Sequence, residues 1–123
     1  MTPPGWPKDL PPTGTSEFDD RVVLWLLDRS PADLRTSPLR SMPLALCCVV
    51  AHSLEGLLAG IRNAYRSART ELADEISPSD LLTLQQALEA QGARIAAVRR
   101  EVALVESALR LASAGANRRH HLD

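Results

Sequence analysis

Two residues of this 123-residue chain could bind a metal ion together. His52 and Glu55 are three positions apart, so on a helix they occupy neighbouring places on one face. Di-iron bundles use Glu-x-x-His pairs with further glutamates from other helices. Here the order is reversed and the pair occurs once. We therefore expect no cofactor and a buried His52 bonded to Glu55 or to an acid of the first helix. The alternative is a small-ligand or metal-binding bundle that uses His52 and Glu55.

The two cysteines, Cys47 and Cys48, are adjacent within an apolar run. Neighbouring helical residues point about 100° apart, so we expect no disulfide between them but a buried, reduced pair. Cys47 and His52 lie about 140° apart around a helix, so this imidazole does not face the thiol. A phosphate-binding loop, a Cys-x-x-Cys pair and a nucleophile elbow are all missing from the sequence. We therefore predict a protein that is not an enzyme.

Arginines along one helix side are the remaining polar candidates. Arg62, Arg66 and Arg69 could contact phosphates, which makes a nucleic-acid-contacting regulator a weaker alternative. Acidic residues are interleaved with the arginines, however, and the one aromatic residue among them, Tyr65, is a predicted core position, so no aromatic platform is expected to stack on bases. The chain has 14 basic and 15 acidic residues, a net charge of −1 that gives no general attraction to nucleic acid. A solvated, salt-bridged helix surface is the preferred interpretation.

These residues must be positioned by helices, and the clearest helical pattern in the sequence lies between Pro78 and Ala112. Its core positions recur at steps of four and three, with one polar interruption at Gln91. These positions are Leu84, Leu88, Gln91, Ile95, Val98, Val102, Val105, Leu109 and Ala112. Such a heptad predicts a long amphipathic helix that needs partners along its whole length.

Two further helices are predicted upstream, over about 16–29 and 43–76, and the heptad helix covers about 78–112. Thr15 or Ser16 can cap the first helix, and Ser77 with Pro78 ends the second and begins the third. The core positions of the second helix are Cys47, Val50, Leu54, Leu57, Ile61, Tyr65, Ala68, Leu72 and Ile76. So short a connection forces the long helices into an antiparallel hairpin. We predict an all-α fold, a coiled-coil-like hairpin with the short first helix packed on it.

The position of the connection predicts the register of the hairpin. If residues equidistant from it lie level, Arg66 faces Glu89 in an exposed ion pair worth at most about 1 kcal/mol. Gly56, Gly60 and Gly92 lie inside the helices, where glycine costs about 1 kcal/mol relative to alanine. We therefore expect close packing at these glycines, with Trp25 or a partner helix filling the space.

The ends of the chain differ from its helical body. Residues 1–14 are rich in proline and glycine, which predicts an extended arm. This arm is either a flexible tail or docks Trp6 into a groove on the body.

The arm lacks the basic start and apolar core of a signal peptide. The longest apolar run of the chain, 44–51, is too short for a membrane span. We expect a soluble, cytoplasmic protein without membrane contact, with a single domain over 15–113 and a flexible tail over 114–123.

Several short runs carry a resemblance to a known group of proteins. They are Trp6-Pro7, the run 23–28 (VLWLLD), Ala51-His52 with Glu55, the run 89–94 (EAQGAR) and the run 99–102 (RREV). On these runs the chain resembles short, uncharacterised actinobacterial proteins, and the resemblance covers most of its length. It implies an all-helical fold, a cytoplasmic location and no assigned activity.

The helix lengths predict an incomplete core. A first helix of about four turns covers at most half of a hairpin whose helices have about nine turns each. A second seam on the third helix, made of Ala97, Leu104 and Leu111, adds apolar surface beside the start of the second helix. We predict that Trp25 fills this region and that a second copy of the chain covers the remaining surface. The sequence therefore predicts an interaction or scaffold protein that forms a homodimer.

Overall fold

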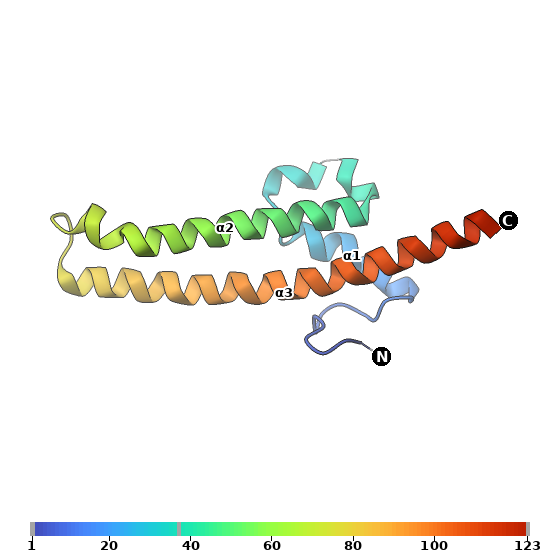
Figure 1. The fold of residues 1–123 in the computed structure, drawn as a ribbon, viewed down its shortest axis with the longest axis horizontal. Helices are drawn as coiled ribbons and strands as arrows, with labels where there is room; N and C mark the ends of the chain where they lie inside the picture. Colours follow the sequence, from blue (N-terminus) through green and yellow to red (C-terminus); the bar gives the residue numbers. More distant parts are fainter. Residues whose placement is uncertain (1, 37, 123) are drawn as a thin grey trace. The chain divides into compact units, whose positions relative to one another are not determined.

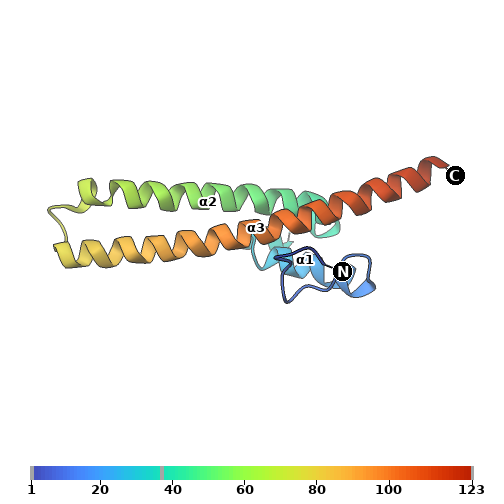
Figure 2. The ribbon, with the colours of Figure 1, turned by 60° about the horizontal axis from the view of Figure 1, so that its bottom comes forward.

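The computed structural model describes residues 2–36 and 38–122, and their side chains except those of 36 and 117–122. Within these ranges the chain forms helices and no strands. They are α1 (Ser16–Leu27), the short 3-10 helices η1 (Ala32–Thr36) and η2 (Pro38–Ser41), α2 (Pro43–Leu72) and α3 (Pro78–Leu122). Helices α2 and α3 form a hairpin and α1 packs on them, which confirms the predicted all-α fold (Figures 1 and 2).

The starts of α1 and α3 follow the predicted caps. Thr15 Oγ1 accepts a hydrogen bond from the Phe18 amide at 3.1 Å. Ser77 Oγ accepts one from the Asp80 amide at 3.1 Å, and Pro78 occupies the first position of α3. Each cap satisfies an amide that has no partner within its own helix. The local sequence therefore determines where these two helices begin.

The carboxyl ends of α1 and α2 differ from the prediction. Helix α1 ends at Leu27 rather than at 29, with Asp28 as its cap. Helix α2 ends at Leu72 rather than at 76, and the amides of Glu75 and Ile76 both donate to the Leu72 carbonyl. Acidic side chains are unfavourable at the negative end of a helix dipole, which accounts for the early stop before Asp74 and Glu75.

Helix α3 continues beyond the predicted end of the heptad. Its last residue is Leu122 rather than Ala112, so residues 114–122, predicted as a flexible tail, are helical. The segment after Ala112 contains two more alanines, and alanine has the highest helix propensity. Asp123 lies outside the described residues.

The chain divides into two compact units. Unit 1 comprises Met1–Ser53 and Arg100–Asp123, and unit 2 comprises Leu54–Arg99. Unit 1 contains a well-buried core. The arm, α1, the first part of α2 and the part of α3 after Arg99 contribute to it. Its apolar core residues, each at most 4% exposed, are Leu10, Phe18, Val22, Trp25, Leu26, Leu27, Leu46, Cys47, Val50, Val102 and Val105. Burial this complete requires neighbours on every side of the core.

The N-terminal arm docks within unit 1. Trp6 Nε1 donates to the Leu10 carbonyl at 2.9 Å, and the Trp6 ring lies 6.1 Å from the Phe18 ring, centroid to centroid. Pro7 and Leu10 are buried. Gly5 has a φ of 84°, and a Cβ at this residue would lie 3.6 Å from Leu104 Cδ1. Of the two interpretations of the arm, docking is therefore the one that the structure supports.

Unit 2 is built from the two long helices alone. Tyr65 donates a hydrogen bond to Glu89 Oε1 at 3.0 Å, so the predicted register is correct to within one residue. The specific pair differs, because Glu89 bonds Tyr65 while Arg66 donates to Asn63 on its own helix. An offset of one residue changes which side chain reaches across, but leaves the pairing of helical turns intact.

The buried face of α2 in unit 2 matches the predicted one at Leu54 and Ala68, which are buried, but differs at one turn. Leu57, predicted as a core residue, is 50% exposed, whereas Leu58 is 2% exposed. Within the chain a Cβ at Gly56 or Gly60 would meet nothing within 4 Å, so Trp25 does not pack against them, and close packing with a partner helix at these glycines stays a prediction. At Gly92, by contrast, a Cβ would lie in ordinary contact with the other helix, 3.8 Å from Ile61 Cγ2 and 3.9 Å from Leu58 Cδ1.

Helix α2 is also notable for its hydropathy. Within the described residues it is the one helix long and apolar enough to cross a membrane, with a mean hydropathy of 1.9 over its most apolar window. Only 28% of that window is buried. Length and composition of this kind also occur in core helices of soluble proteins, so the cytoplasmic location stays a prediction.

Candidate functional site

The predicted metal ligands lie on the surface of α2. His52 and Glu55 are both exposed, so the expectation of a buried histidine is wrong. Among the residues whose side chains are described, no group of three or more histidine, cysteine, aspartate or glutamate residues is placed to hold a metal ion. Within that part of the chain, the structure therefore adds no third metal ligand to His52 and Glu55.

The two cysteines have different environments. Cys47 is fully buried, and its Sγ donates to the Val102 carbonyl at 3.7 Å. Burial, with a smaller contribution from the Glu106 carboxylate, raises the pKa of this thiol from 9.0 to about 12. Cys48 is half-buried, and its sulfur accepts a hydrogen bond from Arg110 Nη2 at 3.5 Å. The predicted burial holds for Cys47 alone, and its protonated thiol is a poor nucleophile at neutral pH.

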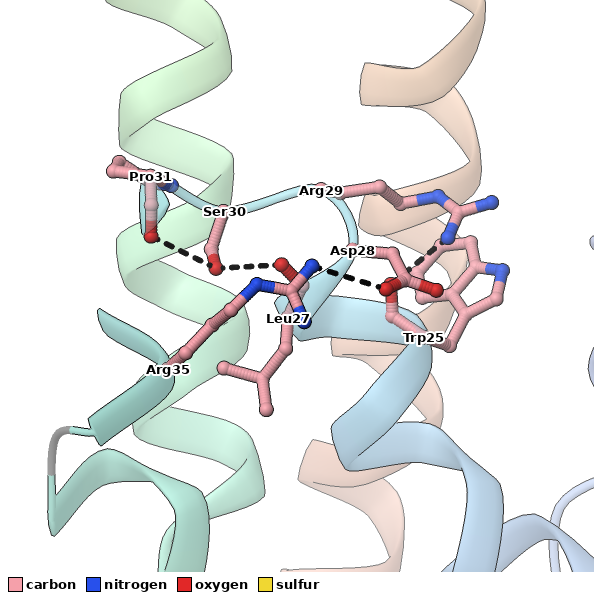
Figure 3. Close-up of polar contacts among 7 residues, drawn as sticks. All are labelled: Trp25, Leu27, Asp28, Arg29, Ser30, Pro31 and Arg35. Atoms are coloured by element: carbon pink, nitrogen blue, oxygen red, sulfur yellow. Dashed lines mark hydrogen bonds and ion pairs between the residues drawn. The ribbon is translucent and has the colours of Figure 1, made fainter. Parts of the chain in front are cut away.

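Trp25, a predicted interaction residue, is buried inside unit 1. Its Nε1 donates to Asp9 Oδ1 at 3.2 Å, and the Arg29 guanidinium lies 3.9 Å from the ring centroid. Arg29 also donates to the Trp25 carbonyl at 2.8 Å (Figure 3). It approaches Asp9 at 3.6 Å. Arg35 and Asp28 form an ion pair at 3.2 Å beside this cluster (Figure 3). Trp25 therefore anchors the arm of its own chain.

The other predicted interaction residues are not equally accessible. Trp6 is half-buried in the docked arm, and Leu104 is half-buried beside Gly5 of the same arm. Ala97, in unit 2, is also half-buried. Leu111 is 72% exposed on the last part of α3. In unit 1 the arm thus occupies part of the seam that was predicted to receive a second copy.

A more open surface lies in unit 2, between α2 and α3. It contains a hollow of about 430 Å³. Its apolar lining residues are Leu58, Ile61, Leu88, Gly92, Ala93 and Ala96, and its polar lining residues are Arg62, Tyr65, Arg66 and Glu89. The small side chains at Gly92, Ala93 and Ala96 leave this space opposite the larger residues of α2. The hollow has an apolar floor with charged residues at its edge.

A second hollow of about 400 Å³ lies near the end of the hairpin. Its lining residues are Arg69, Ala73, Ile76, Ser77, Pro78, Leu81, Leu82 and Gln85. Along α3 the lining positions 82, 85, 89, 92 and 96 recur at steps of three and four, so both hollows lie on one face of the hairpin. We call this face, lined by the residues of the two hollows, the open seam.

The open seam was not predicted from the sequence, although part of its border was identified. Arg62, Arg66 and Arg69 were singled out as possible phosphate contacts, and all three line the two hollows. The signal for an open surface was the predicted shortness of the first helix relative to the hairpin. A signal that could have located the space was the set of small residues Gly92, Ala93 and Ala96 on α3.

Comparison with protein-family models, with curated proteins and with solved structures finds no match to this chain. The resemblance to short actinobacterial proteins therefore stays a prediction.

Proposed function

We propose that this chain is a non-enzymatic helical interaction protein that binds a helix of its partner along the open seam. The observation that carries the proposal is the hollow of about 430 Å³ with its apolar floor. Helices that recognise one another in this way place apolar side chains in a groove and charged side chains at its edges. The open seam has both features in the required positions.

The burial of unit 2 supports the same proposal. Several core positions of the hairpin are only half-buried, among them Ile61, Leu72, Leu84, Leu88 and Val98. Leu82, in the lining of the second hollow, is 56% exposed. Removing apolar surface from water contributes about 25 cal/mol per Å², so a partner helix on this face is stabilised by the surface it covers.

The test is a photo-cross-linking experiment in the cells that contain the protein. A benzophenone amino acid replaces Ala93 in the first hollow, and the matched control carries it at Ala103, an exposed alanine of α3 in unit 1. We expect a discrete adduct from position 93 and little or none from position 103. The absence of an adduct from position 93, in a variant that is helical and stably expressed, would contradict the proposal.

Separating membrane from soluble material in the same lysates tests the cytoplasmic location.

A further inference from the structure

We infer that the helix bound by the open seam is an acidic amphipathic helix of a different protein, with carboxylates along the flank that faces α2. The inference rests on the proposed function and names the chemistry of the partner at the same surface. It follows from the charges that border the two hollows and from the apolar floor of the first.

The border of the open seam on α2 is basic. Arg62 and Arg66 line the first hollow, Arg69 lines the second, and all three side chains are exposed. Steps of four and three residues place these arginines in a row along the helix. Arg66 donates a hydrogen bond to Asn63, a neutral side chain that does not compensate its charge. Three guanidinium groups therefore border the seam on this side.

The border on α3 carries little charge. Among its lining residues Glu89 alone is charged, and its carboxylate accepts the hydrogen bond of Tyr65 at 3.0 Å. The other acidic residues of unit 2 line neither hollow; they are Glu55, Glu71, Asp74, Glu75 and Asp80. The open seam is therefore positively charged on a chain whose net charge is −1.

The apolar floor favours a helix over a nucleic acid as the source of the negative charge. Leu58, Ile61 and Leu88 line the first hollow, where sugars and phosphates would leave their apolar surface without a matching partner. Tyr65, the aromatic residue of this lining, is bonded to a carboxylate that repels phosphate. An amphipathic helix places apolar side chains on such a floor and its flanking carboxylates beside the arginines.

The lining also gives the length of the bound helix. On α2 it runs from Leu58 to Ile76, a separation of 18 residues. This distance is about 27 Å along a helix, so a partner helix of about five turns covers both hollows. A second copy docked by its own open seam would bring three more arginines and one carboxylate to the interface. The charges therefore favour a different protein as the partner.

The experiment measures the binding of two synthetic peptides to purified full-length protein. Both are fluorescein-labelled, alanine-based helices of about 20 residues, with leucines at steps of three and four. The acidic peptide has glutamates along one flank of the leucines, and the basic peptide has lysines at the same positions. Fluorescence anisotropy gives the dissociation constant of each.

Two variants of the protein accompany the wild type. The seam variant carries Arg62→Glu and Arg66→Glu. The matched control carries Arg21→Glu and Arg94→Glu, which reverse the same charge at exposed arginines that line neither hollow. Circular dichroism verifies that each variant keeps its helices.

We expect the wild type to bind the acidic peptide about tenfold more tightly than the basic peptide, because each flanking carboxylate meets an arginine. The seam variant should prefer the basic peptide, and the control should behave as the wild type. Added NaCl should weaken binding of the acidic peptide. If the seam variant loses helix, the peptide preference of the wild type and its salt dependence decide the question.

Three results would overturn the inference. They are an acidic peptide that binds no more tightly than the basic one, a seam variant that keeps the wild-type preference, or a labelled DNA duplex that binds the wild type more tightly than the acidic peptide. The proposed function fails separately, when position 93 gives no adduct in cells. An adduct to a second copy of this chain, or to a helix without an acidic flank, keeps the open seam as a binding surface and rejects the acidic partner.

Discussion

The two units use the same pair of helices with very different results. In unit 1, Val102 and Val105 of α3 are fully buried, as are Leu46 and Val50 of α2. In unit 2, Leu84, Leu88 and Val98 continue the same heptad of α3 but are only half-buried. Apart from Gln91 in unit 2, the heptad positions are apolar in both units, so the difference lies chiefly in the number of neighbours. A heptad determines which face of a helix is apolar, and the packed elements around it determine how far that face is buried.

The largest expected effect comes from truncating matched leucines in the two units. Leu26 in unit 1 is 0% exposed, and Leu26→Ala is expected to lower the free energy of unfolding by about 3 kcal/mol through lost burial and a cavity. Leu88 in unit 2 is half-buried, and Leu88→Ala is expected to cost about 1 kcal/mol. Urea unfolding at a concentration low enough to avoid association measures both. Equal losses would show that the two units are packed alike.

A smaller effect is expected in the pH dependence of stability. The pKa of Cys47 is raised to about 12 in the folded chain from its ordinary value of 9.0, chiefly by burial. The contribution of this thiol to the free energy of unfolding is therefore fully present below pH 9. It is lost as the pH rises from 9 to about 12, because the unfolded chain releases the proton first. At pH 10 the loss is about 1 kcal/mol.

The variant Cys47→Ala removes this contribution, and its stability should fall less steeply above pH 9 in urea unfolding at several pH values. Some slope remains, because Glu89, by accepting the hydrogen bond of Tyr65, also raises the pKa of that phenol. An unchanged slope in Cys47→Ala would show that the interior of unit 1 admits water at this thiol.

Local signals were sufficient to predict the helices and most of their order. The caps at Thr15 and Ser77, and the pairing of turns that brings Tyr65 to Glu89, follow from residues within a few positions of each feature. The burial of Leu58 in place of Leu57 was not predictable in this way. Leu57 and Leu58 are chemically identical neighbours, and only the position of α3 determines which of them is buried.

The candidate site was predicted only in part, again because its position depends on how distant elements pack. The shortness of the first helix predicted an open surface, but its position depends on where the arm and α1 pack. Because the arm lies beside Leu104, the open apolar surface is found in unit 2, rather than along the whole seam of Ala97, Leu104 and Leu111. Proline content alone did not decide whether the arm would dock, since docking depends on the partners of Trp6 and Asp9.

Amide hydrogen exchange of the purified chain tests the central claim most directly. The amides of 82–96 in unit 2 should exchange faster than those of 102–105 in unit 1, because less packing protects them. A profile that is equally protected in both units would contradict the account.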